Sequence, residues 1–171
     1  NSTGDVTIVS DSGAVTVSTN GWEYLIEGVA ESATPSTGQL GTRVVITGAS
    51  LRGGGSEVVG VTLLNVAAEI ISENDTHVEV TAATGPNSAA TGDVVLTSDS
   101  GAVVTGEDIF TYSSPGAINF VNPDTGQQDT QVTLTGSSIC GGGSTVVQVL
   151  LAGRAATILQ ENCVGNIILV R

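Results

Sequence analysis

Lysine and methionine are absent from this chain, histidine occurs once, and aromatic residues make up only 3% of the sequence. Four arginines stand against 17 acidic residues, so the net charge at neutral pH is −13. Because nucleic-acid phosphates require a basic protein surface, this charge argues against a nucleic-acid partner. No stretch approaches the roughly 18 apolar residues of a membrane span. Neither an initiator methionine nor a signal peptide is present, which favours a mature or excised segment.

Residues suited to catalysis are equally scarce. A Ser-His-Asp arrangement would need His77, which has no nucleophile motif around it. One histidine and two distant cysteines do not supply the closed ligand set of a zinc site. The runs Gly53–Gly55 and Gly141–Gly143 lack the lysine and the helix start of a phosphate-binding loop, and are typical of flexible hairpin loops. We therefore expect no enzymatic activity, no catalytic residues, no metal and no cofactor.

Turn carboxylates are the one group that could hold calcium. Their spacing matches neither an EF-hand nor a nonapeptide repeat, so solvated turn carboxylates are the favoured interpretation. The residues concerned are Asp5, Asp11, Asp93 and Asp99.

Short alternations of apolar and polar residues indicate β-strands throughout the chain. Val44 and Ile46 alternate with polar neighbours, as do Trp22 and Tyr24. Turn signals recur about every 8–12 residues, and no helical stripe of useful length is present. About seven short strands in under about 90 residues predict an all-β, immunoglobulin-like sandwich.

The sequence also repeats itself at an offset of 88 residues. Tyr24 matches Tyr112 at this offset, and so do several longer stretches. These stretches are Gly4–Val6 with Gly92–Val94, Ser10–Val15 with Ser98–Val103, and Gly53–Ser56 with Gly141–Ser144. A shared offset across the chain predicts two copies of one structural unit.

The repeat divides the chain unequally. The ungapped alignment places Arg171 on Ala83 and Asn1 on Ala89, so the turn-forming residues 84–88 have no second copy. We predict tandem sandwiches, one complete and one split between the two chain ends. The predicted parts are the C-terminal strands of a unit over 1–28, a complete unit over 29–115, and the N-terminal part of a unit over 116–171.

Both copies resemble the IPT/TIG domain, an immunoglobulin-like family found in tandem in many extracellular proteins. Its pattern opens with Pro-x-x-Gly, continues with Gly-Thr-x-Val-x-Ile-x-Gly and closes with an aromatic-x-Tyr strand. The first copy has these motifs at Pro35–Gly38, Gly41–Gly48 and Phe110–Tyr112. The second copy has similar motifs at Pro123–Gly126, Thr130–Gly136 and Trp22–Tyr24. The resemblance implies the fold and leaves the function open, because this fold serves as spacer, receptor module, enzyme accessory and dimerisation domain.

The two cysteines occupy positions that the repeat relates to a pair of opposite charges. Cys140 and Cys163 match Arg52 and Asp75. This predicts that the same two loops touch in both copies, held by a disulfide in one and by an ion pair in the other; two buried free thiols are the alternative. The disulfide would contribute about 3 kcal/mol, against under about 1 kcal/mol for an exposed ion pair, and would imply an oxidising compartment.

Two N-glycosylation sequons begin at Asn1 and Asn74, both in predicted turns. Attached glycans are one interpretation. The other is chance, because a chain this rich in serine and threonine contains sequons without any modification.

Residues 116–171 by themselves predict a half-built sandwich with open strand edges and an uncovered apolar face. We expect residues 1–28 of a neighbouring copy to cover it, because the short linkers around 29–115 hinder closure within one chain. The predicted acceptor face comprises Val132, Leu134, Val147, Val149 and Leu151. The predicted assembly strands contribute Val6, Ile8, Val15, Val17, Trp22 and Tyr24.

Such a contact does not close on itself, so β-strand addition would generate a filament. We expect a structural subunit of an extracellular or cell-surface fibre, built from separate copies or as one continuous tandem polypeptide. Its expected partners are copies of itself and, at the sequons, glycans. Two alternatives stay open: an adhesin- or receptor-type binding module, and an accessory domain of a secreted polysaccharide-degrading enzyme.

Overall fold

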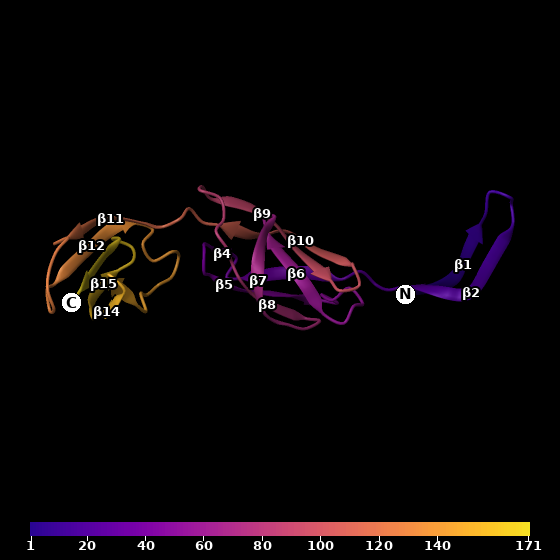
Figure 1. Ribbon diagram of the computed structural model, residues 1–171, viewed down its shortest axis with the longest axis horizontal. Helices are drawn as coiled ribbons and strands as arrows, with labels where there is room; N and C mark the ends of the chain where they lie inside the picture. Colours follow the sequence, from indigo (N-terminus) through magenta and orange to yellow (C-terminus); the bar gives the residue numbers. More distant parts are fainter.

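The computed structural model describes all residues, 1–171, and its regular elements are all β-strands, which confirms the all-β prediction. The strands form three bodies along the chain: an N-terminal hairpin, a complete sandwich and a smaller C-terminal sandwich (Figure 1). No helix is long and apolar enough to cross a bilayer.

The N-terminal body is a two-stranded antiparallel hairpin of β1 (Ser2–Val9) and β2 (Val15–Tyr24). Neither strand pairs with any other strand, and every residue of both is exposed. An isolated two-stranded hairpin is marginally stable in water, and this body has no buried core of its own.

The central body is a complete sandwich whose strands follow the order β3-β5-β8-β7-β6-β9-β10-β4. The long strand β7 pairs with β8 along one part and with β6 along another, so it joins the two layers. All pairings are antiparallel except that of β10 with β4. The strands are β3 (Val29–Thr34), β4 (Thr37–Gly38), β5 (Arg43–Ala49), β6 (Val58–Leu63), β7 (Val66–Glu73), β8 (His77–Thr81), β9 (Ala90–Ser98) and β10 (Val103–Tyr112).

Sixteen buried side chains from both layers form the core of this body. Val44 and Ile46 on β5 are fully buried, whereas Arg43 beside them is exposed, because successive side chains of a strand point to opposite faces. Phe110 and Tyr112 on β10 close the core with their ring centroids 5.2 Å apart in an edge-to-face arrangement.

The C-terminal body has a much smaller core than the central one. It consists of a four-stranded sheet, β11-β12-β16-β15, and a separate hairpin, β13-β14. Only four side chains form its buried cluster: Val132, Leu134, Ile168 and Val170. The strands are β11 (Ala117–Asn122), β12 (Val132–Ser137), β13 (Val149–Leu151), β14 (Arg154–Ala156), β15 (Ile158–Asn162) and β16 (Ile167–Val170).

The N-terminal hairpin has the same internal geometry as β9 and β10. Each of its strand pairings has a counterpart 88 positions later, including the irregularity beside Val6 and Val94. Asn20 and Asp108 both adopt φ of 52°, and each donates its backbone N–H to an aspartate, Asp5 at 2.8 Å and Asp93 at 3.0 Å. The hairpin therefore holds the conformation of the last two strands of a sandwich without touching one.

The C-terminal body corresponds to the first part of the central sandwich, with one departure from the ungapped alignment. Val132 faces Val170 where Val44 faces Val80, so the offset grows from 88 on β12 to 90 on β16. Two extra residues in the loop between β15 and β16 account for this change. The predicted alignment of the chain end is therefore wrong: Arg171 lies where the central unit has Thr81, rather than Ala83.

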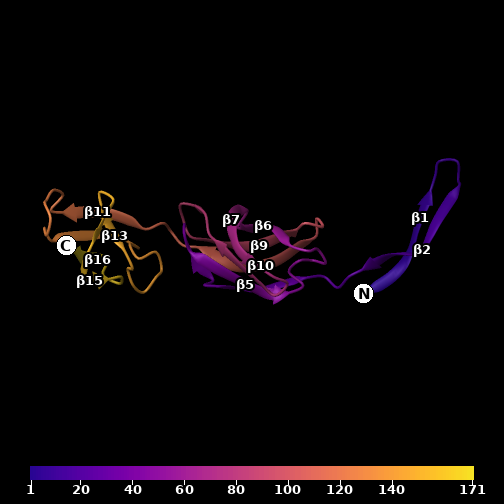
Figure 2. The same ribbon diagram turned by 60° about the horizontal axis from the view of Figure 1, so that its bottom comes forward.

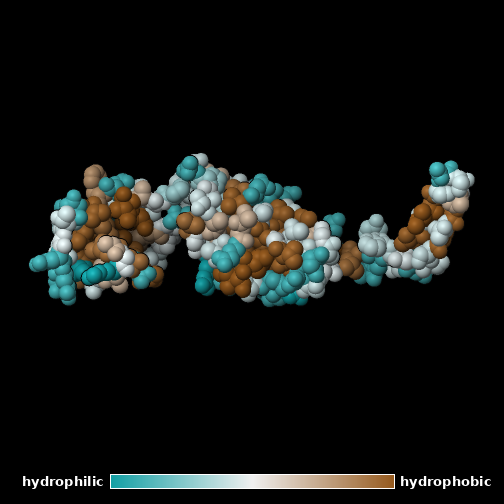
Figure 3. Space-filling view, viewed as in Figure 1, coloured by the Kyte–Doolittle hydropathy of each residue, from teal (hydrophilic) through white to brown (hydrophobic).

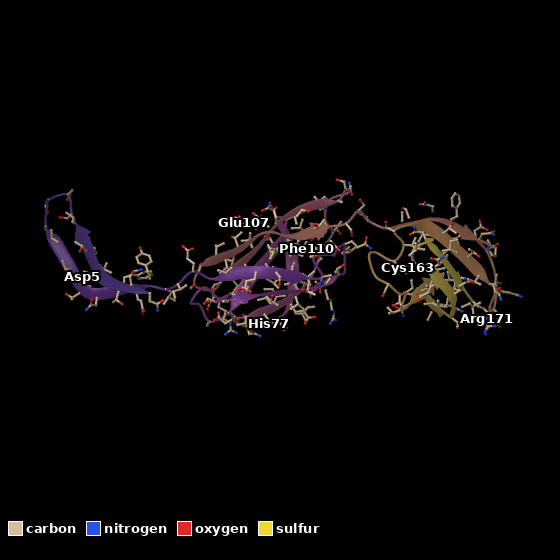
Figure 4. All side chains as sticks on the ribbon, turned by 180° about the vertical axis from the view of Figure 1, so that it is seen from behind. Asp5, His77, Glu107, Phe110, Cys163 and Arg171 are labelled. Atoms are coloured by element: carbon tan, nitrogen blue, oxygen red, sulfur yellow. A yellow bond between two sulfur atoms is a disulfide. The ribbon has the colours of Figure 1, made fainter.

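The three bodies lie in a row, with the hairpin and the C-terminal body at opposite ends in both views (Figures 1 and 2). Figure 4 likewise separates Asp5 on the hairpin from Arg171 on the C-terminal body by the whole central sandwich. The hairpin of a chain in this arrangement does not cover the C-terminal body of the same chain.

Candidate functional site

The central sandwich shows how a two-stranded hairpin completes this type of fold. β9 pairs with β6, and β10 pairs with both β9 and β4. The inward side chains Val94, Leu96, Phe110 and Tyr112 are at most 1% exposed. Burying a side chain of this size contributes about 1.5–3 kcal/mol.

The matching side chains of the N-terminal hairpin are uncovered. Val6, Ile8, Trp22 and Tyr24 are 40%, 64%, 56% and 68% exposed. The rings of Trp22 and Tyr24 meet edge-to-face at 5.9 Å, much as Phe110 and Tyr112 do. Figure 3 shows the resulting apolar surface running along the hairpin. These side chains are uncovered on a hairpin whose strand register already matches that of β9 and β10.

Two of the six predicted assembly residues lie on the other face of the hairpin. Val15 and Val17 match Val103 and Thr105, and both of these are exposed in the complete sandwich. The inward positions of β2 alternate with them, because neighbouring side chains of a strand point to opposite sides. Their inclusion in the assembly face is therefore corrected: the inward apolar set is Val6, Ile8, Trp22 and Tyr24.

Four of the five predicted acceptor residues belong to the small core of the C-terminal body or pack against it. Val132 and Leu134 are buried, and Val149 and Leu151 are half-buried at the edge of the small core. Val147, in contrast, is 94% exposed, and its counterpart Val59 is 55% exposed in the complete sandwich.

The inward residue at this edge is Val146, which the sequence-based prediction missed. It packs against the small core, and its counterpart Val58 is 4% exposed. The β6–β9 pairing has an irregularity between Val58 and Gly60, and a bulge of this kind adds one residue to a strand and reverses the alternation beyond it. Alternation counted back from Val149 therefore selects the wrong valine.

One strand edge of the C-terminal body is left without a partner. β13 occupies the position of β6, but it pairs only with β14, whereas β6 pairs with β7 and β9. An unpaired edge of this kind accepts a further strand. The edge that holds β9 in the central sandwich is therefore open in the C-terminal body.

A carboxylate anchors the hairpin tip in the central sandwich. Asp99 accepts hydrogen bonds from the backbone N–H of Ser56 at 2.9 Å, from the Ser56 hydroxyl and from the Ser98 hydroxyl at 3.0 Å. The hydrogen bond from the Ser56 side chain is the main reason why the pKa of Asp99 falls to about 2. Asp11 and Ser144 stand at the corresponding positions of the hairpin and the C-terminal body.

This anchor predicts how acid affects the central sandwich. The pKa of Asp99 is about 2 in the folded state against 3.8 without the contacts, so its stabilisation is complete above pH about 4 and disappears as the pH falls towards about 2. Asp99→Asn should reduce the slope of stability against pH in this window, measured by urea unfolding of the two proteins. An identical slope in both proteins would contradict the role of Asp99.

The predicted ion pair of the central sandwich involves a different carboxylate. The guanidinium of Arg52 binds Glu73, with Nε at 3.0 Å and Nη2 at 2.8 Å from its oxygens. Asp75 instead accepts the backbone N–H of Arg52 at 3.1 Å. The hydrogen bond from Arg52 lowers the pKa of Glu73. The predicted Arg52–Asp75 ion pair is thus wrong: the guanidinium binds Glu73, and Asp75 contacts the backbone of Arg52 instead.

The predicted disulfide between Cys140 and Cys163 is present, with the Cα atoms 5.5 Å apart. Figure 4 places Cys163 within the C-terminal body. It joins the two loops that Arg52 and Asp75 connect in the central sandwich. Glu161, the counterpart of Glu73, still accepts the backbone N–H of Val146 there. The bridge therefore replaces the arginine in a body that has few buried contacts of its own.

Removing this disulfide should destabilise the C-terminal body. The double substitution Cys140→Ser and Cys163→Ser is expected to lower the free energy of unfolding of the C-terminal body by about 3 kcal/mol, because the unfolded chain gains freedom. Denaturant unfolding with and without a reductant measures this difference. Reduction of the unsubstituted chain should match the variant, and the variant itself should not respond to the reductant.

The structure shows what surrounds His77, the first Gly-rich loop and the aspartates considered as calcium ligands. His77 is exposed, and its Nδ1 lies 2.9 Å from the Thr76 hydroxyl. In the first Gly-rich loop, the N–H groups of Gly53 and Gly55 donate to the carbonyls of Ser50 and Arg52. These donors are therefore not available to a phosphate. Asp5 and Asp93 lie within strands β1 and β9, so their predicted placement in turns is wrong, whereas Asp99 lies in the turn after β9. All three accept backbone N–H groups and are not simply solvated.

The two sequons differ in their surroundings. Asn74 is exposed, and its Oδ1 accepts the N–H groups of Thr76 and His77, both at 2.9 Å. The side-chain amide of Asn1 instead donates to Glu23 at 3.1 Å and accepts from Ile26 at 3.0 Å.

Comparison with known proteins agrees with this fold. Two structures of the plexin A4 extracellular region are similar to this chain. The structure of domains 1 to 10 has a TM-score of 0.52 and 16% sequence identity over 99% of this chain. The structure of domains 1 to 8 has a TM-score of 0.51 and 18% sequence identity over 86% of this chain. The match spans 15% of each plexin chain. An auxiliary nutrient binding protein from Bacteroides thetaiotaomicron has a TM-score of 0.43 at 18% identity, over 57% of this chain and 23% of that one.

No curated protein matches the chain. The family model described as "IPT/TIG domain" matches residues 29–112, which are the residues from the start of β3 to the end of β10. Its strands form the immunoglobulin-like sandwich described above, and the aromatic pair at the end of β10 closes its core. Residues 29–112 of this chain are therefore an IPT/TIG domain.

Proposed function

We propose that this protein is a structural subunit of an extracellular fibre of IPT/TIG-type sandwiches. In this proposal the hairpin of residues 1–28 in one copy completes the sandwich that residues 116–171 begin in the next copy, and residues 29–115 form the complete unit between them. The observation that carries it is the hairpin itself, which has the strand register of β9 and β10 and an uncovered apolar face where theirs is buried.

The central sandwich provides the register of the proposed joint. Val61 faces Leu96, Thr62 faces Val95 and Leu63 faces Val94 across β6 and β9. Transferred to the joint, Val149 would face Ile8, Leu150 would face Thr7 and Leu151 would face Val6 of the neighbouring copy. In the same way β2 would lie parallel to Thr125 and Gly126, as β10 lies beside β4. Each partner thus satisfies an edge that the other leaves open.

The geometry of a single chain supports a fibre rather than a closed ring of two. The hairpin and the acceptor body lie at opposite ends of an elongated chain (Figures 1 and 2). A contact between two different surfaces that does not close generates a filament. The same joint would also arise within one long tandem polypeptide, where the hairpin would complete a preceding unit of the same chain.

The proposed location is outside the cell or on its surface. The chain carries a disulfide, and such bridges persist in oxidising compartments. Its similarity to structures described as the extracellular region of plexin A4 points the same way.

Electron microscopy of the native material, combined with its mass under denaturing and reducing conditions, tests the proposal. Filaments that dissolve into subunits near 17.0 kDa would support separate copies joined by donated strands. Filaments whose chains stay very large would support a covalent tandem array. Monodisperse particles without filaments would overturn the structural role.

A cysteine pair tests the register directly. Thr7→Cys and Leu150→Cys should form a disulfide between copies under oxidising conditions, because directly opposed residues on paired strands bring their Cβ atoms within about 5.5 Å. The matched control joins Val17→Cys with Leu150→Cys and places one cysteine on the outer strand of the hairpin. Linked ladders on a denaturing gel are expected for the first pair and not for the second.

The second candidate is an extracellular binding or accessory module without assembly. The observation that favours it is the similarity to the plexin A4 extracellular region over 99% of this chain. Such a module would be a monomer that a ligand saturates, so the microscopy above separates the two functions.

Glycosylation at Asn74 belongs to the same proposal. Its side-chain oxygen accepts two backbone N–H groups in an exposed turn, and its amide nitrogen makes no hydrogen bond. Secretion from a eukaryotic cell that attaches N-glycans should therefore add a glycan that an amidase removes. The variant Thr76→Val, which destroys the sequon, should show the unmodified mass; an unmodified mass for both proteins would contradict glycosylation.

A further inference from the structure

The junction between the central sandwich and the C-terminal body contains a specific side-chain contact. Gln39, in the turn after β4, accepts the backbone N–H of Gly116 at 2.9 Å. The same side chain lies against Gly141, where an added Cβ would come within 2.3 Å of its amide nitrogen. Gly141 also has a φ of +58°, which side-chain-bearing residues rarely adopt. One glutamine thus fits a corner made by two glycines.

The corresponding turn of the C-terminal body contains Gln127. It has the same backbone hydrogen bond, but its glutamine is exposed. Gln127 donates its backbone N–H to the Thr130 hydroxyl at 3.0 Å, and Gln39 does the same to Thr42 at 3.0 Å. Gln127 is exposed, whereas Gln39 is half-buried beneath the body that follows it. The Gln127 side chain makes no hydrogen bond within this chain, and its turn has the same backbone hydrogen bond as the turn of Gln39.

The second copy of this site, at the start of the central sandwich, is only partly open. Gly28 and Gly53 match Gly116 and Gly141, but the space beside Gly53 is filled, because an added Cβ there would come within 2.7 Å of the Ala102 side chain. The backbone N–H of Gly28, in contrast, donates no hydrogen bond within the chain. The side chain of Leu25, in the linker before Gly28, lies against Gly54, where an added Cβ would come within 2.3 Å of it.

The chain lengths on both sides of the proposed joint agree. Three residues separate Tyr24 from Gly28, as three separate Tyr112 from Gly116. If β2 lies beside Thr125 and Gly126 as β10 lies beside β4, Gly28 arrives at the neighbour's Gln127 as Gly116 arrives at Gln39.

We infer that the side chain of Gln127 accepts the backbone N–H of Gly28 of a second copy, as a contact between copies that is additional to the donated strands. This inference rests on the proposed function. Its partner is a second copy of this chain, and its chemistry is an amide oxygen that accepts a backbone N–H, as Gln39 accepts that of Gly116. The same contact at every joint fixes the angle between successive sandwiches. The fibre is therefore a regular rod rather than a chain of sandwiches joined by flexible linkers.

Hydrogen exchange of the assembled full-length protein, resolved to single amides by mass spectrometry, tests this inference. Gly28 should exchange slowly in the assembly, and Gln127→Ala should speed its exchange about fivefold, the factor expected for one neutral hydrogen bond. Gly116 is the internal reference, because Gln39 already binds it within the chain. Gln39→Ala should therefore speed exchange at Gly116 and leave Gly28 unchanged.

The outcomes separate this inference from the function on which it rests. Protection of β1 together with faster exchange of Gly28 in Gln127→Ala supports both. Protection of β1 with no change at Gly28 overturns the Gln127 contact and leaves strand donation intact. Exchange of β1 and Gly28 at the rates of the dilute single chain, under conditions where the material is filamentous, overturns both.

Discussion

Trp22→Asp is expected to abolish assembly while the IPT/TIG domain of residues 29–112 stays folded. The counterpart of Trp22 is Phe110, which is fully buried in the complete sandwich. An aspartate at this place would bring an unpaired charge into an apolar core, which costs several kcal/mol. Trp22 makes no contribution to the core of the central unit, so that unit should be unaffected. Microscopy measures the filaments, and thermal unfolding measures the central unit.

The structure supplies a matched control on the same strand. Val17→Asp introduces the same charge five residues away, but the counterpart Thr105 is exposed, so assembly should proceed. On the acceptor side, Leu151→Asp should block assembly and Val147→Asp should not, because their counterparts Leu63 and Val59 are buried and exposed respectively. If Trp22→Asp and Val17→Asp assemble into filaments to the same extent, the strand-donation proposal is wrong.

A second hairpin appended after Arg171 is expected to convert the polymer into a monomer. The appended segment would fill the acceptor edge within the same chain, where its effective concentration far exceeds that of any neighbour. Because Arg171 lies where the central unit has Thr81, the insert should copy residues 82–88 and then residues 1–28. Light scattering should report a single chain, and the C-terminal body should unfold at a higher temperature.

The control for this design carries Trp22→Asp in the appended hairpin only. That hairpin should not dock, so the free N-terminal hairpin of a neighbour should still bind and filaments should form. If the unsubstituted appended chain still forms filaments of the usual length, the C-terminal body is not the acceptor.

Parts of this molecule follow from local sequence. Strand alternation and turn residues predicted the all-β sandwich, because a strand buried on one face must alternate apolar and polar residues. The closing strand was recognisable from Phe110–Tyr112, whose aromatic side chains complete the core. The disulfide was predicted because Cys140 and Cys163 match two positions that form a contact in the other unit.

Other features depended on irregularities that leave no simple mark in the sequence. The irregular pairing at Val58 and Gly60 changes which neighbouring valine points inward, so Val146 was missed and Val147 was wrongly included. Two extra residues before β16 shift the last strand without changing its apolar pattern. Arg52 binds Glu73, and Asp75 accepts the backbone N–H of Arg52, a choice of partners that the sequence pattern does not show.

The sequence alone predicted the strand content and the aromatic pair that closes the central core, because these depend on periodicity and on side-chain type. Only the tertiary structure decided which side chains face a core, which strand edges are open and which carboxylate an arginine meets. These properties depend on register, and a single bulge or a two-residue insertion changes the register without changing composition. Val17 and Trp22 are both apolar residues of one strand, and the fold alone separates the outer face from the face proposed to bind a neighbour.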